Sequence, residues 1–300
     1  MENDEKNIEN LELDESAIQL LRALEKENKN VRDFLIKSYN GIPVAPEIEE
    51  EVYNYCVNHS MIFTAALTNP GTSVLTEFLY EGIPSPSPLD NYFLQSKAGR
   101  AVKARLLAIE KELPKIIDTY RSKGDVLIGN LGSGPGRDVI NVFSTHYQNV
   151  SNIKAINIDK DINALKRGKI MATKQKVDHL VKFVQESFLN YNSPQKFDIL
   201  LLIGILCPLD TETCINILKT IKKNLKEDGC LIASNAAPKM QKDDPFTYHI
   251  MEWGPNWKMV FKNEEELRQI YEKAGYIWKG YFLDSYGFHT IGMGIPHSYS

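Results

Sequence analysis

A glycine-rich segment, Gly132-Ser133-Gly134-Pro135-Gly136, is the part of the chain whose residue types point most directly to chemistry. It follows an apolar run at 126–131 and precedes a helical pattern at 136–147, which is where nucleotide-binding loops lie. Glycines let the backbone turn sharply and let a ligand approach the main chain. A dinucleotide pattern, G-x-G-x-x-G, would end at position 137, where Arg137 stands. The G-K-S/T ending of a phosphate-binding loop is also absent. The spacing is G-x-G-x-G.

The elements around this loop predict its setting. Short strand-like runs alternate with helical patterns, which is the signature of a doubly wound α/β sheet. The strand-like runs are 126–131, 153–158, 180–185, 197–203 and 230–234, and the helical patterns are 136–147, 161–174, 211–226 and 263–274. Two further strand-like runs, 276–283 and 288–295, are separated only by a short turn, so we expect a terminal antiparallel hairpin.

The first third of the chain has a different composition and residue pattern. Residues 1–15 hold seven acidic residues against one lysine, so we expect a flexible acidic tail. Helical spacing then predicts a small helical cap at 16–95 with long loops, ending near the Pro/Ser-rich patch at 84–88. One amphipathic helix, 98–120, leads into the α/β core, which we place at 96–300 with an inserted lid at about 236–262.

At the glycine loop the sequence resembles motif I of the class I S-adenosylmethionine-dependent methyltransferases, and the same order of elements covers residues 98–300. Asp159 ends the second strand, where that family places an acid on the ribose hydroxyls of the cofactor. Glu186-Ser187-Phe188 ends the third strand, where the family reads adenine. The resemblance implies a Rossmann-like core with a mostly parallel seven-stranded sheet, S-adenosyl-L-methionine as cofactor and S-adenosyl-L-homocysteine as product.

One departure concerns the family's usual acid two residues before the first loop glycine, where this chain has Asn130. An amide can still bond the methionyl amino group, but without charge pairing. The cofactor-binding residues that the resemblance implies are Asn130, Gly132, Ser133, Gly134, Gly136, Asp159, Lys160, Glu186, Ser187, Phe188, Ile203, Gly204 and Arg100. Arg100 could pair with the methionyl carboxylate, although Arg100 and Arg105 could equally form the solvated face of a helix.

The sequence says less about the molecule that accepts the methyl group. The chain has no N/D-P-P-Y/F after the fourth strand, which disfavours amino-methylating enzymes that act on adenine or glutamine. Cys207-Pro208 reverses the Pro-Cys order of cytosine-methylating enzymes, and we expect a buried thiol there. The four cysteines show no zinc spacing, so we expect reduced thiols and no metal.

Residues 243–257 bear a looser resemblance to bacterial small-molecule and fatty-acyl-ester-type methyltransferases. In class I folds this insertion roofs the substrate pocket, so we expect Trp253 and Trp257 to form part of an aromatic wall against the substrate. Tyr92 in the helical cap and His289 in the last hairpin are the other expected substrate residues. An acceptor oxygen or nitrogen that carries a proton needs a base, whereas a carboxylate needs none. His249 is the first candidate for that base, followed by Tyr248 or His289, although packing roles compete for all of these side chains.

Composition limits the partners. The chain has 300 residues and a formal net charge of −4, and no apolar run is long enough to span a membrane. The N-terminus does not resemble a signal peptide, so we expect a cytoplasmic enzyme. We expect a small-molecule substrate and a possible homodimer, and nucleic acid is disfavoured. Two alternatives stay open at this point: a nucleic-acid or protein methyltransferase, and a non-catalytic module that keeps the fold.

Overall fold

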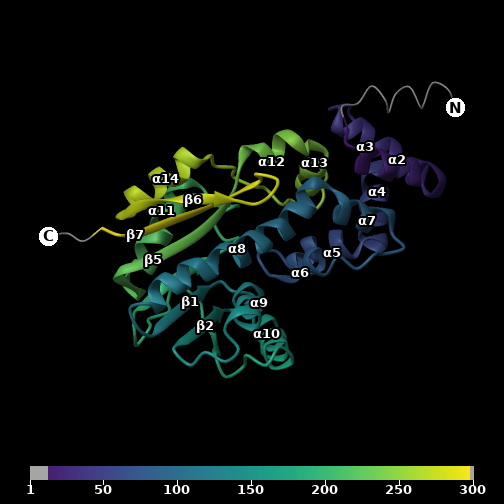
Figure 1. The fold of residues 1–300 in the computed structure, drawn as a ribbon. Coiled ribbons are helices and arrows are strands. Elements are labelled where there is room, and N and C mark those ends of the chain that lie inside the picture. The colour runs from purple at the N-terminus through teal and green to yellow at the C-terminus, as the bar shows by residue number, and fades with distance from the viewer. Residues whose placement is uncertain (1–12, 298–300) are drawn as a thin grey trace. The chain divides into compact units, whose positions relative to one another are not determined.

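The computed structural model describes residues 13–297 and divides the chain into two compact units (Figure 1). The helical unit combines the chain through Lys103 with a later segment, Lys239–Lys258. The sheet unit combines Ala104–Pro238 with the chain from Met259 onward. The boundary expected at 95/96 therefore falls after Lys103, and most of the expected lid groups with the N-terminal helices. The predicted acidic tail lies outside the described residues, except that Asp14 and Glu15 already belong to the start of a helix.

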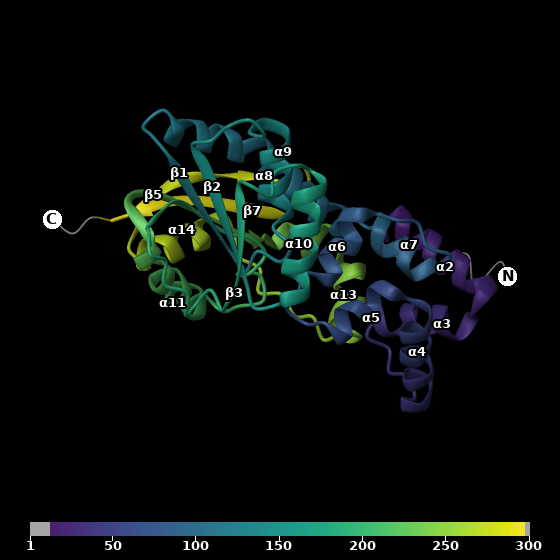
Figure 2. The same ribbon diagram turned by 90° about the horizontal axis from the view of Figure 1, so that it is seen from below.

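The sheet unit is built on a seven-stranded sheet in the order β3-β2-β1-β4-β5-β7-β6 (Figure 2). The first five strands pair in parallel, and β7 runs antiparallel between β5 and β6. The predicted fold class is thereby confirmed. Strand order reverses between β1 and β4, so the ligand crevice of this topology lies at their carboxyl ends. The strands are β1 (Val126–Leu131), β2 (Ile153–Asp159), β3 (Val181–Gln185), β4 (Phe197–Leu202), β5 (Leu225–Ala236), β6 (Tyr276–Leu283) and β7 (His289–Pro296).

Helices cover both faces of this sheet, which explains why every residue of the central strand β4 is buried. In β4, Ile199 and Leu201 join the core on one face, while Leu200 and Leu202 join the core on the other. One face is covered by α8 (Lys97–Arg121), α9 (Arg137–His146) and α10 (Ile162–Lys174), and the other by α11 (Thr211–Ile221) and α14 (Glu264–Lys273) (Figure 2). A short 3-10 turn, Lys222–Asn224, follows α11.

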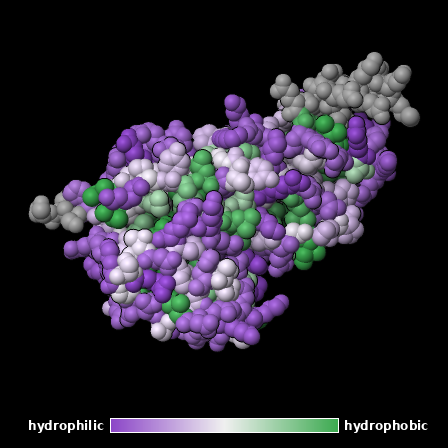
Figure 3. Space-filling view, viewed as in Figure 1, coloured by the Kyte–Doolittle hydropathy of each residue, from purple (hydrophilic) through white to green (hydrophobic). Residues whose placement is uncertain are grey.

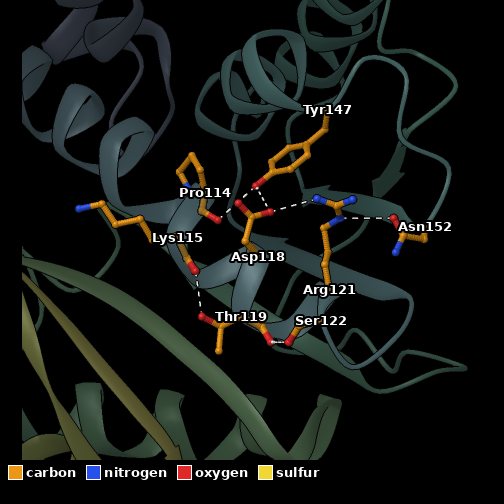
Figure 4. A network of polar contacts seen from close by, with 8 residues as sticks. All are labelled: Pro114, Lys115, Asp118, Thr119, Arg121, Ser122, Tyr147 and Asn152. Atoms are coloured by element: carbon orange, nitrogen blue, oxygen red, sulfur yellow. Dashed lines mark hydrogen bonds and ion pairs between the residues drawn. The ribbon is translucent and has the colours of Figure 1, made fainter.

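Polar contacts fix the carboxyl end of α8 against the sheet unit (Figure 4). The Tyr147 hydroxyl, just after α9, lies 3.1 Å from the Pro114 carbonyl oxygen and 3.0 Å from Asp118 Oδ1. Arg121 pairs with the same carboxylate at 3.0 Å and donates from Nε to Asn152 Oδ1 at 3.3 Å. Pro114 does not end the helix. These contacts hold the part of α8 that belongs to the sheet unit, which also carries Arg105.

The helical unit has its own apolar core, formed by helices from both of its chain segments. Phe34, Phe63 and Leu24 come from the N-terminal segment, and Phe246 and Ile250 come from the later one. Its helices are α2 (Glu15–Glu27), α3 (Lys29–Tyr39), α4 (Pro46–His59), α5 (Met61–Thr68), α6 (Val74–Glu81), α7 (Pro88–Gln95), α12 (Pro238–Asp243) and α13 (Pro245–Trp253). The second segment therefore completes a core that the first segment cannot close alone.

Hydrophilic residues cover most of the face drawn in Figure 3, and hydrophobic residues appear there in small separate groups. Within residues 13–297, no helix is both long enough and apolar enough to cross a bilayer.

Candidate functional site

The glycine loop lies between β1 and α9, at the crevice that the strand order defines. Gly132, Gly134 and Gly136 have φ values of 60°, 55° and 76°, a left-handed backbone that side chains rarely adopt. A Cβ at Gly132 would lie 2.7 Å from Ile205, and one at Gly136 would lie 2.1 Å from the Asn157 amide nitrogen. The loop thus needs glycine both for its backbone angles and for close approach to its neighbours.

Asp159, at the end of β2, orders this loop as well as presenting a carboxylate. Its Oδ2 accepts the Gly134 N–H at 2.7 Å, and its Oδ1 accepts the Asp161 N–H at 2.8 Å. A carboxylate has about four acceptor positions, so both oxygens retain capacity for ribose hydroxyls. Ser133 lies in the loop with its hydroxyl donating to the Gly134 carbonyl at 3.1 Å, and Lys160 is exposed.

Residues after β3 border the same loop. Phe188 is half-buried, and a Cβ at Gly132 would lie 3.6 Å from its ring. Glu186 is exposed, and its N–H donates to the Asp159 carbonyl at 3.1 Å. Ser187 is half-buried and begins the turn that carries Phe188. The structure therefore brings the predicted adenine segment next to the predicted ribose acid and the glycine loop.

Asn130, at the end of β1, is 1% exposed and is held by its own network. Its Nδ2 donates to Asp138 Oδ1 at 2.9 Å and to Asn157 Oδ1 at 3.1 Å. Both amide hydrogens are used in this way, so the remaining role of the Asn130 amide is that of an acceptor through its oxygen. Burial raises the pKa of Asp138 to about 6, although its hydrogen bonds to Val139 N–H and Asn130 oppose that shift.

The chain after β4 carries Ile203 and Gly204, both half-buried. Gly204 has φ 77° and donates its N–H to Ser234 Oγ at 2.9 Å. The Arg105 guanidinium lies beside it, 3.3 Å from where a Cβ at Gly204 would stand. Arg105 is only 6% exposed, so a buried cation lies at the end of the strand that faces the transferred group in this class of fold.

Lys262 bonds the loop that follows β4. It is 1% exposed, and its ammonium contacts four oxygens: Leu206 O at 3.2 Å, Leu209 O at 2.7 Å, Val260 O at 2.9 Å and Asn235 Oδ1 at 3.3 Å. The backbone adds Val260 N–H to Cys207 O at 2.7 Å and Lys262 N–H to Ala236 O at 3.0 Å. One buried ammonium therefore ties the loop after β4 to the end of β5.

Sequence reasoning missed Arg105 as a site residue and missed Lys262 altogether. Arg105 stands four residues after Ala101 and four before Ile109, both buried, so the helical period already assigned it to the buried stripe of α8. Arg100, the arginine predicted to reach the cofactor, is exposed in the helical unit and bonds Gln95 through its guanidinium. For Lys262 no signal was available, because its acceptors come from two loops and strand β5, which are far apart in the sequence.

The residues predicted to contact substrate or to act in catalysis from the helical unit have partners within that unit. The Tyr92 hydroxyl is 2.6 Å from Thr247 Oγ1, and its ring is 3% exposed. Trp253 donates Nε1–H to Glu49 at 2.8 Å, and Trp257 packs on the same core. The expected aromatic wall is, to this extent, part of the packing of the helical unit.

His249 and Tyr248 lie on α13. His249 Nε2 is 3.0 Å from Ser38 Oγ, and its ring meets Tyr39 edge-on at 5.6 Å. Burial lowers the pKa of His249, so its imidazole is neutral near pH 7. Burial also raises the pKa of Tyr248, and Glu252 adds to that shift. Their catalytic roles stay predictions.

His289, at the start of β7, belongs to the sheet unit and forms a buried pair with Asp284. The ring Nδ1 lies 3.0 Å from Asp284 Oδ2, and because a carboxylate only accepts, the neutral ring must donate from Nδ1. Burial and, to a smaller extent, nearby Arg105 lower the pKa of His289 to about 4, although Asp284 opposes the shift. The ring is therefore neutral at pH 7, with Nε2 as its acceptor.

This pair makes stability depend on pH. The pKa of His289 is depressed by folding, so the unfolded chain binds the proton first and stability is lost as pH falls from about 6.5 to 4. We expect His289→Gln to reduce that pH-dependent loss by up to about 3 kcal/mol. Urea unfolding of both proteins at pH 7, 5.5 and 4.5 measures it. The pKa of Asp138 is raised by folding, so its titration changes stability with pH in the opposite direction to that of His289. Both proteins contain Asp138, so its contribution cancels in the comparison. A difference between the two proteins that does not change with pH would contradict the assignment.

The four cysteines are buried free thiols, and burial raises the pKa of Cys207 although Arg105 and Lys262 lie near it. A thiol held in its protonated form is a weak nucleophile, so Cys207 is not suited to covalent catalysis. Within residues 13–297, no group of three His, Cys, Asp or Glu side chains is arranged to hold a metal ion.

The sheet unit's residues fit the cofactor that the glycine loop implies. Three left-handed glycines, the Asp159 carboxylate and the half-buried Phe188 lie next to one another. An adenosine needs such an aromatic neighbour and an acid for its two ribose hydroxyls. An amino acid end needs a cation for its carboxylate and an acceptor for its ammonium, which Arg105 and Asn130 can supply.

Comparison with known proteins gives the class. Residues 123–275, just over half of the chain, match a family described as a methyltransferase domain, and the chain belongs to that family. The fold and cofactor predicted from the sequence are those of its class: the chain is a class I S-adenosylmethionine-dependent methyltransferase. The comparison with curated proteins found no match.

Several solved structures share the fold at low identity. A Bordetella parapertussis protein described as a possible exported protein is 14% identical with a TM-score of 0.67, over 94% of this chain and 96% of that one. The magnesium protoporphyrin IX methyltransferase ChlM of Synechocystis PCC 6803, with bound S-adenosylmethionine, is 11% identical with a TM-score of 0.54, over 79% and 98%. The mitomycin 7-O-methyltransferase MmcR is 12% identical with a TM-score of 0.52, over 82% and 71%.

Proposed function

We propose that this enzyme transfers the methyl group of S-adenosylmethionine to an oxygen, or less favourably a nitrogen, of a small molecule. The observation that supports the proposal most strongly is the contact at the end of β4. There Gly204 lies beside the buried guanidinium of Arg105. Structural relatives named for the methylation of a porphyrin and of mitomycin support a small acceptor.

Named residues of the sheet unit would hold the cofactor. Asp159 would accept the ribose hydroxyls, and Phe188 would lie along the adenine. The Gly132–Gly136 backbone would approach the amino acid end. Arg105 would bind the methionyl carboxylate in place of the predicted Arg100, because the Arg105 guanidinium is buried beside Gly204 whereas Arg100 is exposed. A buried guanidinium binds a carboxylate more strongly than an exposed one, because water screens it less.

When bound, S-adenosylmethionine would supply an electrophilic methyl group on its sulfonium, with S-adenosylhomocysteine as the leaving group. The protein has to hold the acceptor in line with the S–CH3 bond and exclude water. The loop after β4 is suited to this positioning because the Lys262 ammonium and the backbone bond from Val260 N–H to Cys207 O fix it.

A hydroxyl or amine acceptor also has to lose a proton. His249 remains the predicted base, with Tyr248 next. His289 is the alternative in the sheet unit, because Asp284 fixes its tautomer and leaves Nε2 as the acceptor. A carboxylate acceptor would use none of them.

The acceptor class can be tested directly. The purified enzyme would be incubated with methyl-labelled S-adenosylmethionine and three separate pools: small hydroxy, carboxy and amino compounds, total RNA, and denatured protein. We expect label in the first pool, in a product that mass spectrometry identifies by a gain of one methyl group. Label only in RNA or protein would overturn the small-molecule proposal, and cofactor binding without label in any pool would favour a non-catalytic module.

The cofactor assignment gives a second expected result. Asp159→Ala should weaken S-adenosylmethionine binding by roughly 100-fold, since it removes charge-assisted bonds to two hydroxyls and frees the Gly134 N–H. Asp161→Ala is the matched control, because Asp161 only caps α10 through the Asn163 N–H. Isothermal titration calorimetry measures both. Equal affinity for the Asp159→Ala variant and the native enzyme would remove Asp159 from the cofactor site.

A further inference from the structure

Asp138 is a buried carboxylate that the cofactor assignment leaves without a role. It is the second residue of α9, directly after the glycine loop, and it is 9% exposed. Its Oδ1 accepts from Asn130 Nδ2 at 2.9 Å and from the Val139 N–H at 2.8 Å. An acid in the first turn of a helix is common at the surface, but here it is buried and directed at an amide at the end of β1.

The amides beside Asp138 form a short chain that reaches the glycine loop. Asn130 Nδ2 also donates to Asn157 Oδ1 at 3.1 Å. Asn157 is fully buried, and within residues 13–297 its Nδ2 has no hydrogen-bond partner. A Cβ at Gly136 would lie 2.1 Å from that nitrogen, so the amide lies directly against the loop backbone. A buried, unsatisfied donor at this point marks a place where a ligand or water is expected.

The charges around Asp138 come from few elements. Helix α8 contributes Arg105 and Glu110, α9 itself contributes Arg137, and β1 and β2 contribute the amides Asn130 and Asn157. Glu110 is bonded by Asn141 Nδ2 at 2.6 Å. Asp138 is thus the acid that contacts Asn130. Position 130 is where members of this class commonly have a carboxylate of their own.

We propose that Asp138 supplies the negative charge for the α-ammonium of the bound cofactor, acting through Asn130. The hydrogen bond from Asn130 Nδ2 to the carboxylate makes the Asn130 oxygen a stronger acceptor, and that oxygen is the atom available to an ammonium donor. Asp138 is therefore a positioning residue, and the charge that position 130 lacks lies eight residues further along the chain. The inference rests on the proposed cofactor site and adds which end of the cofactor this network recognises.

Three ligands separate this role from a merely structural one. S-adenosylmethionine and S-adenosylhomocysteine both carry the ammonium, whereas 5′-methylthioadenosine has the nucleoside and sulfur but no amino acid end. We expect Asp138→Asn to weaken binding of the first two by roughly 10- to 100-fold, as for loss of a charge-assisted contact, and to leave the third within about twofold. The double variant Asn130→Asp/Asp138→Asn, which moves the charge to position 130, should recover most of the loss.

The dependence on pH provides a second readout. Protonation of Asp138 removes its charge, and its pKa of about 6 places that event between pH 7 and 5, where an α-amino group stays protonated. Affinity for S-adenosylhomocysteine should fall by up to about tenfold per pH unit below 6 in the native enzyme, and this slope should vanish in Asp138→Asn. Glu110→Gln is the matched control and should keep the slope, because Glu110 titrates nearby without bonding Asn130.

Calorimetric titration of all three ligands at pH 5, 6 and 7 distinguishes the outcomes. If Asp138→Asn weakens 5′-methylthioadenosine as much as the other two, Asp138 only shapes the loop and the proposal is wrong. Unchanged affinity for all three ligands would equally overturn it. If the native enzyme binds none of them, the cofactor site itself is misassigned, which is a failure of the proposed function that takes this inference with it.

Discussion

Replacing Lys262 by methionine is expected to lower the free energy of unfolding by roughly 2–4 kcal/mol. The variant fills the space of the side chain but leaves the carbonyls of Leu206, Leu209 and Val260 and the Asn235 amide oxygen without their shared donor. Each buried acceptor without a partner costs about 1–3 kcal/mol, and removal of a buried charge offsets part of the sum. Loops that relax toward water reduce it further.

Urea unfolding of the native and variant enzymes measures this loss. Lys258→Met is a matched control, since Lys258 is exposed and its replacement should change stability by no more than about 0.5 kcal/mol. Hydrogen exchange should also show faster opening at the Val260 N–H, which bonds the Cys207 carbonyl. If the methionine variant were as stable as the native enzyme, the four contacts would contribute nothing net, and Lys262 could not be what fixes the loop after β4.

Replacing Gly136 by alanine is expected to abolish measurable S-adenosylmethionine binding and to destabilise the sheet unit by several kcal/mol. The new Cβ would stand 2.1 Å from Asn157 Nδ2 and 2.4 Å from its Cγ, and the Asn157 side chain is fully buried. The φ of 76° adds about 1–2 kcal/mol of backbone strain. The loop must therefore move, and the backbone that would approach the cofactor moves with it.

Gly41→Ala is the control that separates backbone strain from steric collision of the new Cβ. Gly41 has φ 68°, but a Cβ there meets nothing within 4 Å, so we expect only the backbone penalty and unchanged cofactor affinity. Adding Asn157→Ala to Gly136→Ala removes the group that is struck and should restore part of the stability. Thermal unfolding and calorimetric titration measure the two effects. A Gly136→Ala variant with native affinity would show that the loop backbone does not contact the cofactor.

The sheet unit could be predicted well from the sequence because its signals are local. The apolar runs at 126–131 and 276–283 coincide with β1 and β6, and the long helix at 98–120 differs from α8 by one residue at each end. A doubly wound sheet leaves few possible strand orders, so the sequence alone predicts that Asp159 and the glycine loop meet at the carboxyl ends of neighbouring strands.

The partners of polar side chains could not be predicted, since they depend on contacts between distant segments. The sequence predicts that Tyr92 and Trp253 contact the substrate, and it gives no sign that Thr247 and Glu49 bond them within the helical unit. An aromatic side chain with one polar atom suits a pocket and a core equally well, so composition cannot separate the two. The pairing of Asn130 with Asp138 depends on how a strand end meets the first turn of a helix, which residue spacing does not encode.

The helical unit is interrupted in sequence, and this affects how the protein is made. On a ribosome, the chain through Lys103 emerges well before Lys239–Lys258, which brings Phe246 and Ile250 to the same core. At about 5–20 residues per second, the delay is on the order of ten seconds. During that time the apolar faces of the first helices lack their last partners and are open to chaperones or to other nascent chains. We therefore expect yield in a cell to depend on chaperone supply more than the stability of the finished enzyme would suggest.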